Sequence, residues 1–191
     1  MRHILTPVDL LVLLFPSLAS GESVRWDDLI ITNGLYFKKF TNVPFSGKVT
    51  GKEQGSLKNG KRVGVWIEYN KDGRVDTEVT YKNGKKDTSV TYSYHLNGQL
   101  ESKITWKDGK KDGSWVFYDE KGRLWSKGEY KNGKEDGPWI YYYDSGQIRL
   151  KGTYKDGKEH GPVITYHQNG QVLLKVTFKD GKKDGPWVDY H

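Results

Sequence analysis

The chain has 191 residues, a formal net charge of +7 and no cysteine, which excludes disulfides, thiolate metal sites and a cysteine nucleophile. Only 35% of its residues are hydrophobic, yet 14% are aromatic. This combination disfavours both a disordered chain and a thick two-layer core, and it fits a thin, one-sided sheet that carries aromatic side chains.

The first segment, residues 1–19, has the features of a secretory signal peptide. It begins with the basic pair Arg2 and His3 and continues with the unbroken apolar run at 10–15. Ser17 and Ala19 then occupy the −3 and −1 positions of a cleavage site. We therefore expect a periplasmic or secreted protein. A retained N-terminal anchor and a misplaced start codon are the alternatives.

Residues 20–59 predict a divergent N-terminal cap. The segment keeps strand-like aromatic residues (Tyr36, Phe37, Phe40 and Phe45), but it lacks the regular spacing found further along the chain. Terminal units of a repeat array are commonly atypical because they finish the stack.

From residue 60 to residue 191 a unit of 24 residues recurs about 5.5 times. The complete copies begin at Gly60, Gly84, Gly109, Gly133 and Gly157, and a truncated sixth copy begins at Gly181. One spacing is 25 residues, with the extra residue between Gly84 and Gly98. A fixed period of this length indicates stacked units rather than a globule with one central site.

Within each copy, apolar and polar residues alternate on both sides of a glycine turn, which predicts one antiparallel β-hairpin per copy. Because strands lie about 4.8 Å apart, each hairpin advances the sheet by about 10 Å, and the array spans on the order of 50 Å. We expect an all-β fold: an elongated, twisted antiparallel meander of repeated hairpins with open edges.

The alternation also predicts two unlike faces. Ile67, Ile140 and Ile164 in the first strands, with Val79 and similar residues in the returning strands, predict the apolar face. The tryptophans at the sixth position of each copy project opposite to the isoleucines, so we expect them on the otherwise charged face. There they form a candidate partner-binding strip, since such residues dominate binding hot spots: Trp66, Trp115, Trp139 and Trp187, joined by Phe117, Tyr141 and Trp125. The structural alternative is that these rings cover turn glycines and lysine stems.

The stretch YKNGKEDGPWIYYYDSGQIRLKGTY at 130–154 resembles the MORN repeat variant of bacterial proteins, and the resemblance covers residues 60–191. It implies a β-hairpin array with a non-enzymatic binding role, and some bacterial members carry an antitoxin label. Thr88 and Val90 stand where the repeat pattern has Gly and Trp, and Val163 also replaces Trp.

No constellation of residues predicts a catalytic, cofactor or metal site. Asp87, Asp112, Asp136 and Asp184 recur before the first strand of their copies, but equivalent positions lie about 10 Å apart, too far for one calcium ion. Asp before Gly is also typical of turns. The five histidines lack ligand-like spacing, and the sequence contains no phosphate-binding loop or nucleophile elbow.

We therefore expect a non-catalytic, exported scaffold that binds another protein or an envelope component. One alternative is an antitoxin or immunity protein that neutralises a toxin. Another is binding of anionic lipid or lipopolysaccharide through Lys61, Arg62, Lys85, Lys86, Lys110, Lys111, Lys182 and Lys183. Nucleic acid is not an expected partner of an exported protein. The predicted sheet edge at 187–190 favours self-association through strand addition.

Overall fold

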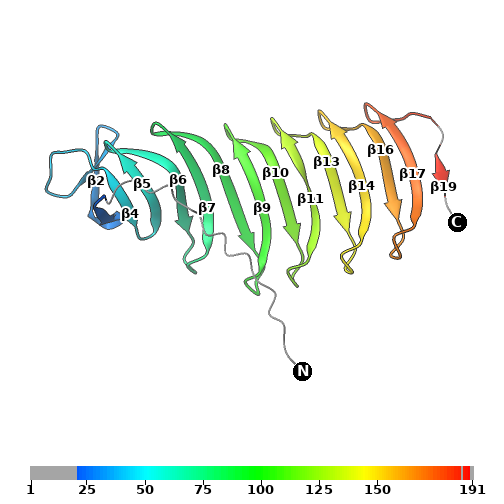
Figure 1. The fold of residues 1–191 in the computed structure, drawn as a ribbon, viewed down its shortest axis with the longest axis horizontal. Helices are drawn as coiled ribbons and strands as arrows, with labels where there is room; N and C mark the ends of the chain where they lie inside the picture. The colour runs from blue at the N-terminus through cyan, green and yellow to red at the C-terminus, as the bar shows by residue number, and fades with distance from the viewer. Residues whose placement is uncertain (1–20, 186, 190–191) are drawn as a thin grey trace, which may run out of the picture.

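The computed structural model describes residues 21–185 and 187–189, so the predicted signal peptide lies outside the described residues. The chain folds into one open sheet of 17 strands and a second sheet of two strands. Figure 1 shows the hairpins side by side in a single elongated row. The predicted all-β meander of repeated hairpins is confirmed.

The large sheet begins in the cap and continues through the repeats in chain order. Its strands are β1 (Ser23–Arg25), β4 (Gly47–Thr50), β5 (Glu53–Lys58), β6 (Lys61–Tyr69), β7 (Val75–Lys82), β8 (Lys85–Tyr94), β9 (Leu100–Lys107), β10 (Lys110–Tyr118), β11 (Leu124–Lys131), β12 (Lys134–Glu135), β13 (Gly137–Tyr142), β14 (Ile148–Lys155), β15 (Lys158–Glu159), β16 (Gly161–Tyr166), β17 (Val172–Lys179), β18 (Lys182–Lys183) and β19 (Val188–Asp189).

Each strand pairs antiparallel with the next one, except that β1 pairs parallel with β4. The short strands β12, β15 and β18 are the first halves of strands that continue as β13, β16 and β19, because both halves pair with the same neighbour.

The turns between repeats are tight two-residue turns. In each, an Asn or Asp with φ between 49° and 52° precedes a glycine that also has positive φ. Asn132 and Gly133, for example, have φ of 52° and 85°. Positive φ at both central residues defines a type I′ turn, whose twist matches that of the flanking strands. The Asn-Gly and Asp-Gly pairs therefore fix where each repeat begins.

The strand register shows that the predicted division of the first strands between the faces is wrong. Trp115 lies opposite Gly128 and Trp139 lies opposite Gly152, whereas Ile140 lies opposite the charged Lys151. The tryptophans therefore share the inner face with the apolar residues of the returning strands. The isoleucines share the outer face with the lysines.

The returning strands follow the predicted division from Ser126 and Leu150 onward. Before that point a register shift pairs Leu124 with Tyr118 and Ile148 with Tyr142, the residues after inner-face Phe117 and Tyr141, so the predicted apolar-face placement of Leu124 and Ile148 is wrong.

The inner face is held together by aromatic rings that cover strand glycines. An added Cβ on Gly128 would lie 2.9 Å from Trp115 Nε1, so only a glycine leaves room for the indole. The ring centroids of Trp115 and Trp139 are 4.7 Å apart, and that of Tyr154 is 5.2 Å from Trp139. Trp139 Nε1 also donates a hydrogen bond of 3.3 Å to the Glu129 carbonyl. Each repeat thus packs on its neighbour through this aromatic row.

The second repeat interrupts the row and compensates for the gap. Thr91, not Val90, takes the tryptophan position, because Thr91 pairs with Ile104 just as Trp115 does on the other side. Val90 instead pairs with Glu78. The indole of Trp106 donates a 2.9 Å hydrogen bond to Thr91 Oγ1. A tryptophan from the returning strand therefore lies beside the position that lacks one.

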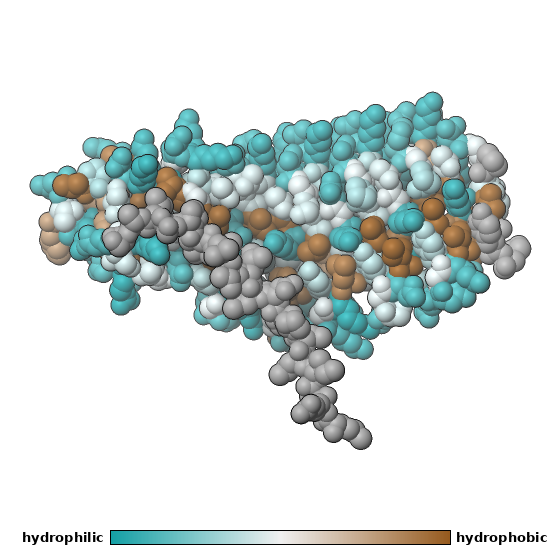
Figure 2. Space-filling view, viewed as in Figure 1, coloured by the Kyte–Doolittle hydropathy of each residue, from teal (hydrophilic) through white to brown (hydrophobic). Residues whose placement is uncertain are grey.

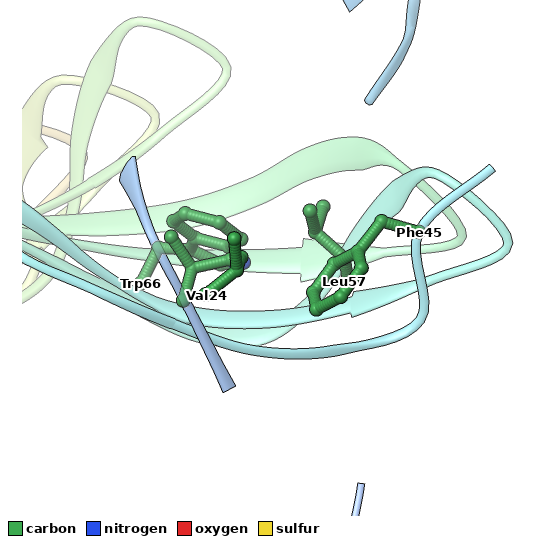
Figure 3. Close-up of a cluster of buried hydrophobic side chains, with 5 residues drawn as sticks. Val24, Phe45, Leu57 and Trp66 are labelled. Atoms are coloured by element: carbon green, nitrogen blue, oxygen red, sulfur yellow. The ribbon is translucent and has the colours of Figure 1, made fainter. Parts of the chain in front are cut away.

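The N-terminal segment covers the first tryptophan of the row. It contains β1, the 3-10 helix η1 (Trp26–Asp28), the two-stranded sheet of β2 (Leu29–Thr32) and β3 (Leu35–Lys38), and β4. Val24, Phe45, Val49 and Leu57 form a buried cluster with Trp66, whose side chain is fully buried (Figure 3). Among the described residues, no helix is long and apolar enough to span a bilayer.

The glycine beneath a tryptophan gives a first prediction. Gly128→Ala should lower the free energy of unfolding by about 1–3 kcal/mol, since the new methyl group collides with the Trp115 indole. Gly152→Ala is the matched control: its added Cβ would meet the smaller Val163 side chain at 3.1 Å, and neither glycine has positive φ. Denaturant unfolding should show a larger loss of stability for Gly128→Ala than for Gly152→Ala. Equal stability of the two variants would contradict the packing described.

Candidate binding surface

The structure separates the predicted aromatic strip into buried and exposed members. Trp66, Trp115 and Trp139 are only 0%, 4% and 8% exposed, so they form the core of the sheet and not an accessible strip. Phe117 and Tyr141 lie on the same inner face and are half-buried, each opposite Ser126.

Two tryptophans of the predicted strip remain at the surface. Trp125 is 49% exposed and Trp187 is 62% exposed. The exposure of Trp187 follows from its position in the last strand pair, where no described strand lies beyond it.

Trp125 forms a small surface cluster with residues of the next repeat, which we name the Trp125 patch: Trp125, Tyr141 and Arg149. The rings of Trp125 and Tyr141 meet edge to face, with centroids 6.1 Å apart. The Arg149 guanidinium lies 5.8 Å from the centroid of the Tyr141 ring. Trp, Tyr and Arg are the side chains most enriched at binding hot spots, so this patch suits a protein contact.

The tyrosine in the Trp125 patch is a neutral hydrogen-bonding group. Burial raises the pKa of Tyr141, and although Arg149 lowers it, the pKa stays above its ordinary value. Burial raises the pKa of Tyr130 and Tyr154 on the same face as well. The inner face therefore presents uncharged phenol rings.

One of the predicted anion-contacting cations is not available to an anion. Arg62 is largely buried and ion-paired with Glu53 at 2.6 Å. Its guanidinium lies over four rings, at 4.3 Å from the centroid of Trp66 and 5.1 to 5.5 Å from those of Trp26, Tyr36 and Tyr81. The prediction for Arg62 is therefore wrong, because the cap closes around this side chain.

Glu53 and the four rings form a cage around Arg62, and the groups of this cage keep the guanidinium charged. Burial works to lower the pKa of Arg62, but Tyr36, Glu53 and Tyr81 outweigh burial and leave the pKa raised. The Tyr36 hydroxyl is 3.1 Å from Arg62 Nε, and the Tyr81 hydroxyl is 3.3 Å from Nη1. Arg62 thus joins the cap to the first repeat.

The remaining predicted cations lie at the turns between repeats. Lys61, Lys85, Lys86, Lys110, Lys182 and Lys183 are exposed. Lys111 is half-buried, with its Nζ 4.9 Å from the centroid of the Tyr130 ring and 6.0 Å from that of Trp106. Most of the predicted lysines are therefore accessible, and Lys111 is partly engaged on the inner face.

The recurring aspartates stabilise neighbouring turns. Asp112 Oδ2 accepts a hydrogen bond of 2.8 Å from the Asn132 backbone N–H, and Asp136 Oδ2 accepts the equivalent bond from Asp156 at 3.3 Å. Within residues 21–185 and 187–189, no group of three or more His, Asp or Glu side chains could hold a metal ion.

Two shallow hollows of the described structure lie beside the cap. One, of about 490 Å³, is lined by Gly51, Lys52 and residues of the 69–73 turn. The other, of about 140 Å³, lies over Val49, Gly55 and Ile67. Their linings come from the cap and first repeat, away from the Trp125 patch.

Comparisons with known proteins agree with the repeat architecture. A family profile described as "Uncharacterised protein" matches residues 45–164, and the profile of the MORN repeat variant matches residues 159–180. No curated protein matches. The chain is also similar to a solved structure titled "Crystal structure of GtfA/B complex bound to UDP and GlcNAc", at 17% identity and a TM-score of 0.25. The match covers 70% of this chain but 24% of that one, and the TM-score is too low to carry an argument.

The cage around Arg62 gives a second prediction. Arg62→Ala should lower the free energy of unfolding by about 2–4 kcal/mol, because it leaves Glu53 unpaired and removes the contacts with the four rings. Lys61→Ala changes the neighbouring exposed residue and should stay within about 0.5 kcal/mol of the wild type. Thermal unfolding of both variants measures the difference. A mild effect of Arg62→Ala would show that the cage is not a structural contact.

Proposed function

The chain belongs to the family whose profile covers residues 45–164, and we propose that it is an exported, non-catalytic scaffold that binds a protein partner or an envelope component. The MORN-type repeats make it a repeat scaffold suited to binding. The observation that carries the proposal is the Trp125 patch, where an exposed tryptophan, a neutral tyrosine and an arginine meet on the surface.

The repeat geometry supports binding over catalysis. The same pairing of a first strand with its returning strand recurs in successive repeats, so the array offers similar shallow environments one after another. A catalytic site needs unlike groups that converge in one pocket, whereas a partner can contact several equivalent positions along the sheet. Export is supported by the signal-peptide features of residues 1–19.

A second candidate function is binding of anionic lipid or lipopolysaccharide through the turns between repeats. The exposure of Lys61, Lys85, Lys110 and Lys182 at these turns favours it. Such binding should weaken as salt is added, since exposed charges are screened. The antitoxin hypothesis stays a sequence-based prediction, and it requires a toxin bound in a one-to-one complex.

The Trp125 patch can be tested with substitutions that leave the core intact. We expect Trp125→Ala and Arg149→Ala to reduce partner binding about tenfold or more, because hot-spot truncations have effects of this size. The measurement is affinity capture from the envelope fraction of the host, with bound proteins quantified by mass spectrometry. Leu96→Ala is the matched control, since Leu96 is a fully exposed apolar residue outside the patch.

A protein retained by the wild type and by Leu96→Ala, but lost from both patch variants, would support the proposal. A capture profile that is unchanged by the patch variants would reject the Trp125 patch as the contact.

Export has its own test. N-terminal sequencing of the full-length protein after host fractionation should give Ser20 as the first residue, in the periplasmic or secreted fraction, because Ala19 is at the −1 position. Recovery of intact Met1 from the cytoplasm would reject export, whatever the outcome for the Trp125 patch.

A further inference from the structure

One margin of the sheet carries a continuous row of paired lysines, which we name the Lys edge. Each of the six turns between repeats has a lysine on both sides, and the register places the two directly opposite each other. All of these side chains are exposed. The pairs are Lys58/Lys61, Lys82/Lys85, Lys107/Lys110, Lys131/Lys134, Lys155/Lys158 and Lys179/Lys182.

The fold does not require these lysines. Like charges directly opposite each other on neighbouring strands are destabilising. The type I′ turns depend on Asn-Gly or Asp-Gly at their centres and not on the flanking residues. Among the residues that the structure describes, the ion pair formed by the Lys edge is that of Lys82 with Asp87 at 2.7 Å. Six repulsive pairs are thus kept largely uncompensated.

The turns within repeats, at the opposite margin of the sheet, lack this row of paired lysines. The turns within repeats are flanked by unlike residues: Asn70/Arg74, His95/Gln99, Asp119/Arg123, Tyr143/Gln147 and His167/Gln171. Arg123 there is ion-paired with Asp119 and Asp144. The row of paired lysines is therefore specific to one margin.

The Lys edge is long and one turn wide. Successive turns are separated by two strands, or about 10 Å, so the six turns extend over about 50 Å. Figure 2 shows a fringe of hydrophilic residues along the upper margin of the molecule, where Figure 1 places the turn after β17. A row of charge with this shape matches an extended chain better than a compact ligand.

We propose that the Lys edge binds a linear acidic polysaccharide whose carboxylates recur along the chain. The two lysines of a pair have Cβ atoms about 5 Å apart, so their flexible ammonium groups can converge on one carboxylate. The Asn or Asp between them can hydrogen-bond to sugar hydroxyls. One turn then holds one charged sugar and its neighbour, and the next turn repeats the contact.

The turns themselves argue against nucleic acid. Asp108, Asp156 and Asp180 are exposed between the lysines of three turns. A duplex with one charge per about 1.7 Å would bring phosphates against these carboxylates. Single-stranded nucleic acid needs aromatic side chains for stacking. The exposed tryptophans of the described structure are Trp125, beside the opposite margin, and Trp187 in the last strand pair.

A bilayer is also a poorer match than a polymer. Stable attachment at a membrane surface combines charge with buried apolar side chains. The exposed large apolar residues described in the structure lie away from the Lys edge, in the cap (Ile30, Ile31, Phe40, Val43), beside the opposite margin (Leu96, Trp125) or in the last strand pair (Trp187, Val188). The Lys edge thus offers charge and hydrogen bonds, which suit a hydrated polymer.

The test uses the protein with polygalacturonate as the acidic polymer and its fully methyl-esterified form as the neutral one. Calorimetry should detect binding of the acidic polymer that weakens with salt, and about tenfold weaker or undetectable binding of the ester. The variant with Lys131, Lys134, Lys155 and Lys158 all changed to Gln should lose about tenfold or more in affinity.

The matched control changes Lys52, Lys71, Lys121 and Lys175 to Gln, which removes the same charge from exposed sites outside the Lys edge. It should keep affinity within about threefold. A second edge variant, with Lys82, Lys85, Lys107 and Lys110 changed to Gln, covers the case in which the first does not fold. Circular dichroism verifies the fold of each.

Loss of affinity in every edge variant that folds, but not in the control, supports the proposal. Equal losses in edge and control variants, equal binding of the ester, or no binding at all would overturn it. So would tighter binding of short duplex DNA or of anionic phospholipid vesicles. None of these results depends on the Trp125 patch, so failure here leaves the proposed protein partner untouched.

Discussion

The packing of an indole ring over a strand glycine is the contact on which this structure depends. Trp115 covers Gly128, and the space above that glycine is too small for a methyl group. The two residues lie on the paired strands of one hairpin, and Trp139 of the next repeat packs on the Trp115 ring at a centroid distance of 4.7 Å. A single hairpin therefore cannot bury its own ring. This explains why Trp66 needs the cap, and why Trp187 stays 62% exposed in the last strand pair.

The turns could be predicted from the sequence, but the faces could not. Asn132-Gly133 and its equivalents specify type I′ turns through local backbone preference alone. The faces depend on how two strands align: Phe117 pairs with Ser126, but the next residue, Tyr118, pairs with Leu124, so Trp125 is an extra residue in the returning strand. Such an irregularity resets the alternation, and a shift of one residue exchanges the two faces. Period-two counting within one strand cannot detect it.

The same limit applies to the candidate sites. Trp125 and Tyr141 could be singled out by residue type, but their contact between repeats, and the contact of Arg149 with Tyr141 across one hairpin, appear only in the structure. Arg62 resembled the other turn cations in sequence. Its burial depends on Trp26 and Tyr36, which the irregular cap brings across the first repeat. The one sequence signal that could have distinguished Arg62 from the turn lysines is its guanidinium, which stacks on aromatic rings more readily than an ammonium group.

The two margins of the sheet carry different chemistry because they are built from different turns. The turns within repeats vary in sequence, and the Trp125 patch lies beside this variable margin. The turns between repeats keep the same lysine pairs although the charges repel. The inner aromatic row supplies burial that can offset this repulsion. A sheet that is stabilised along its centre can therefore keep a charged margin that its folding does not need. Because the Lys edge does not contribute to folding, binding of a ligand explains its lysines better than stability does.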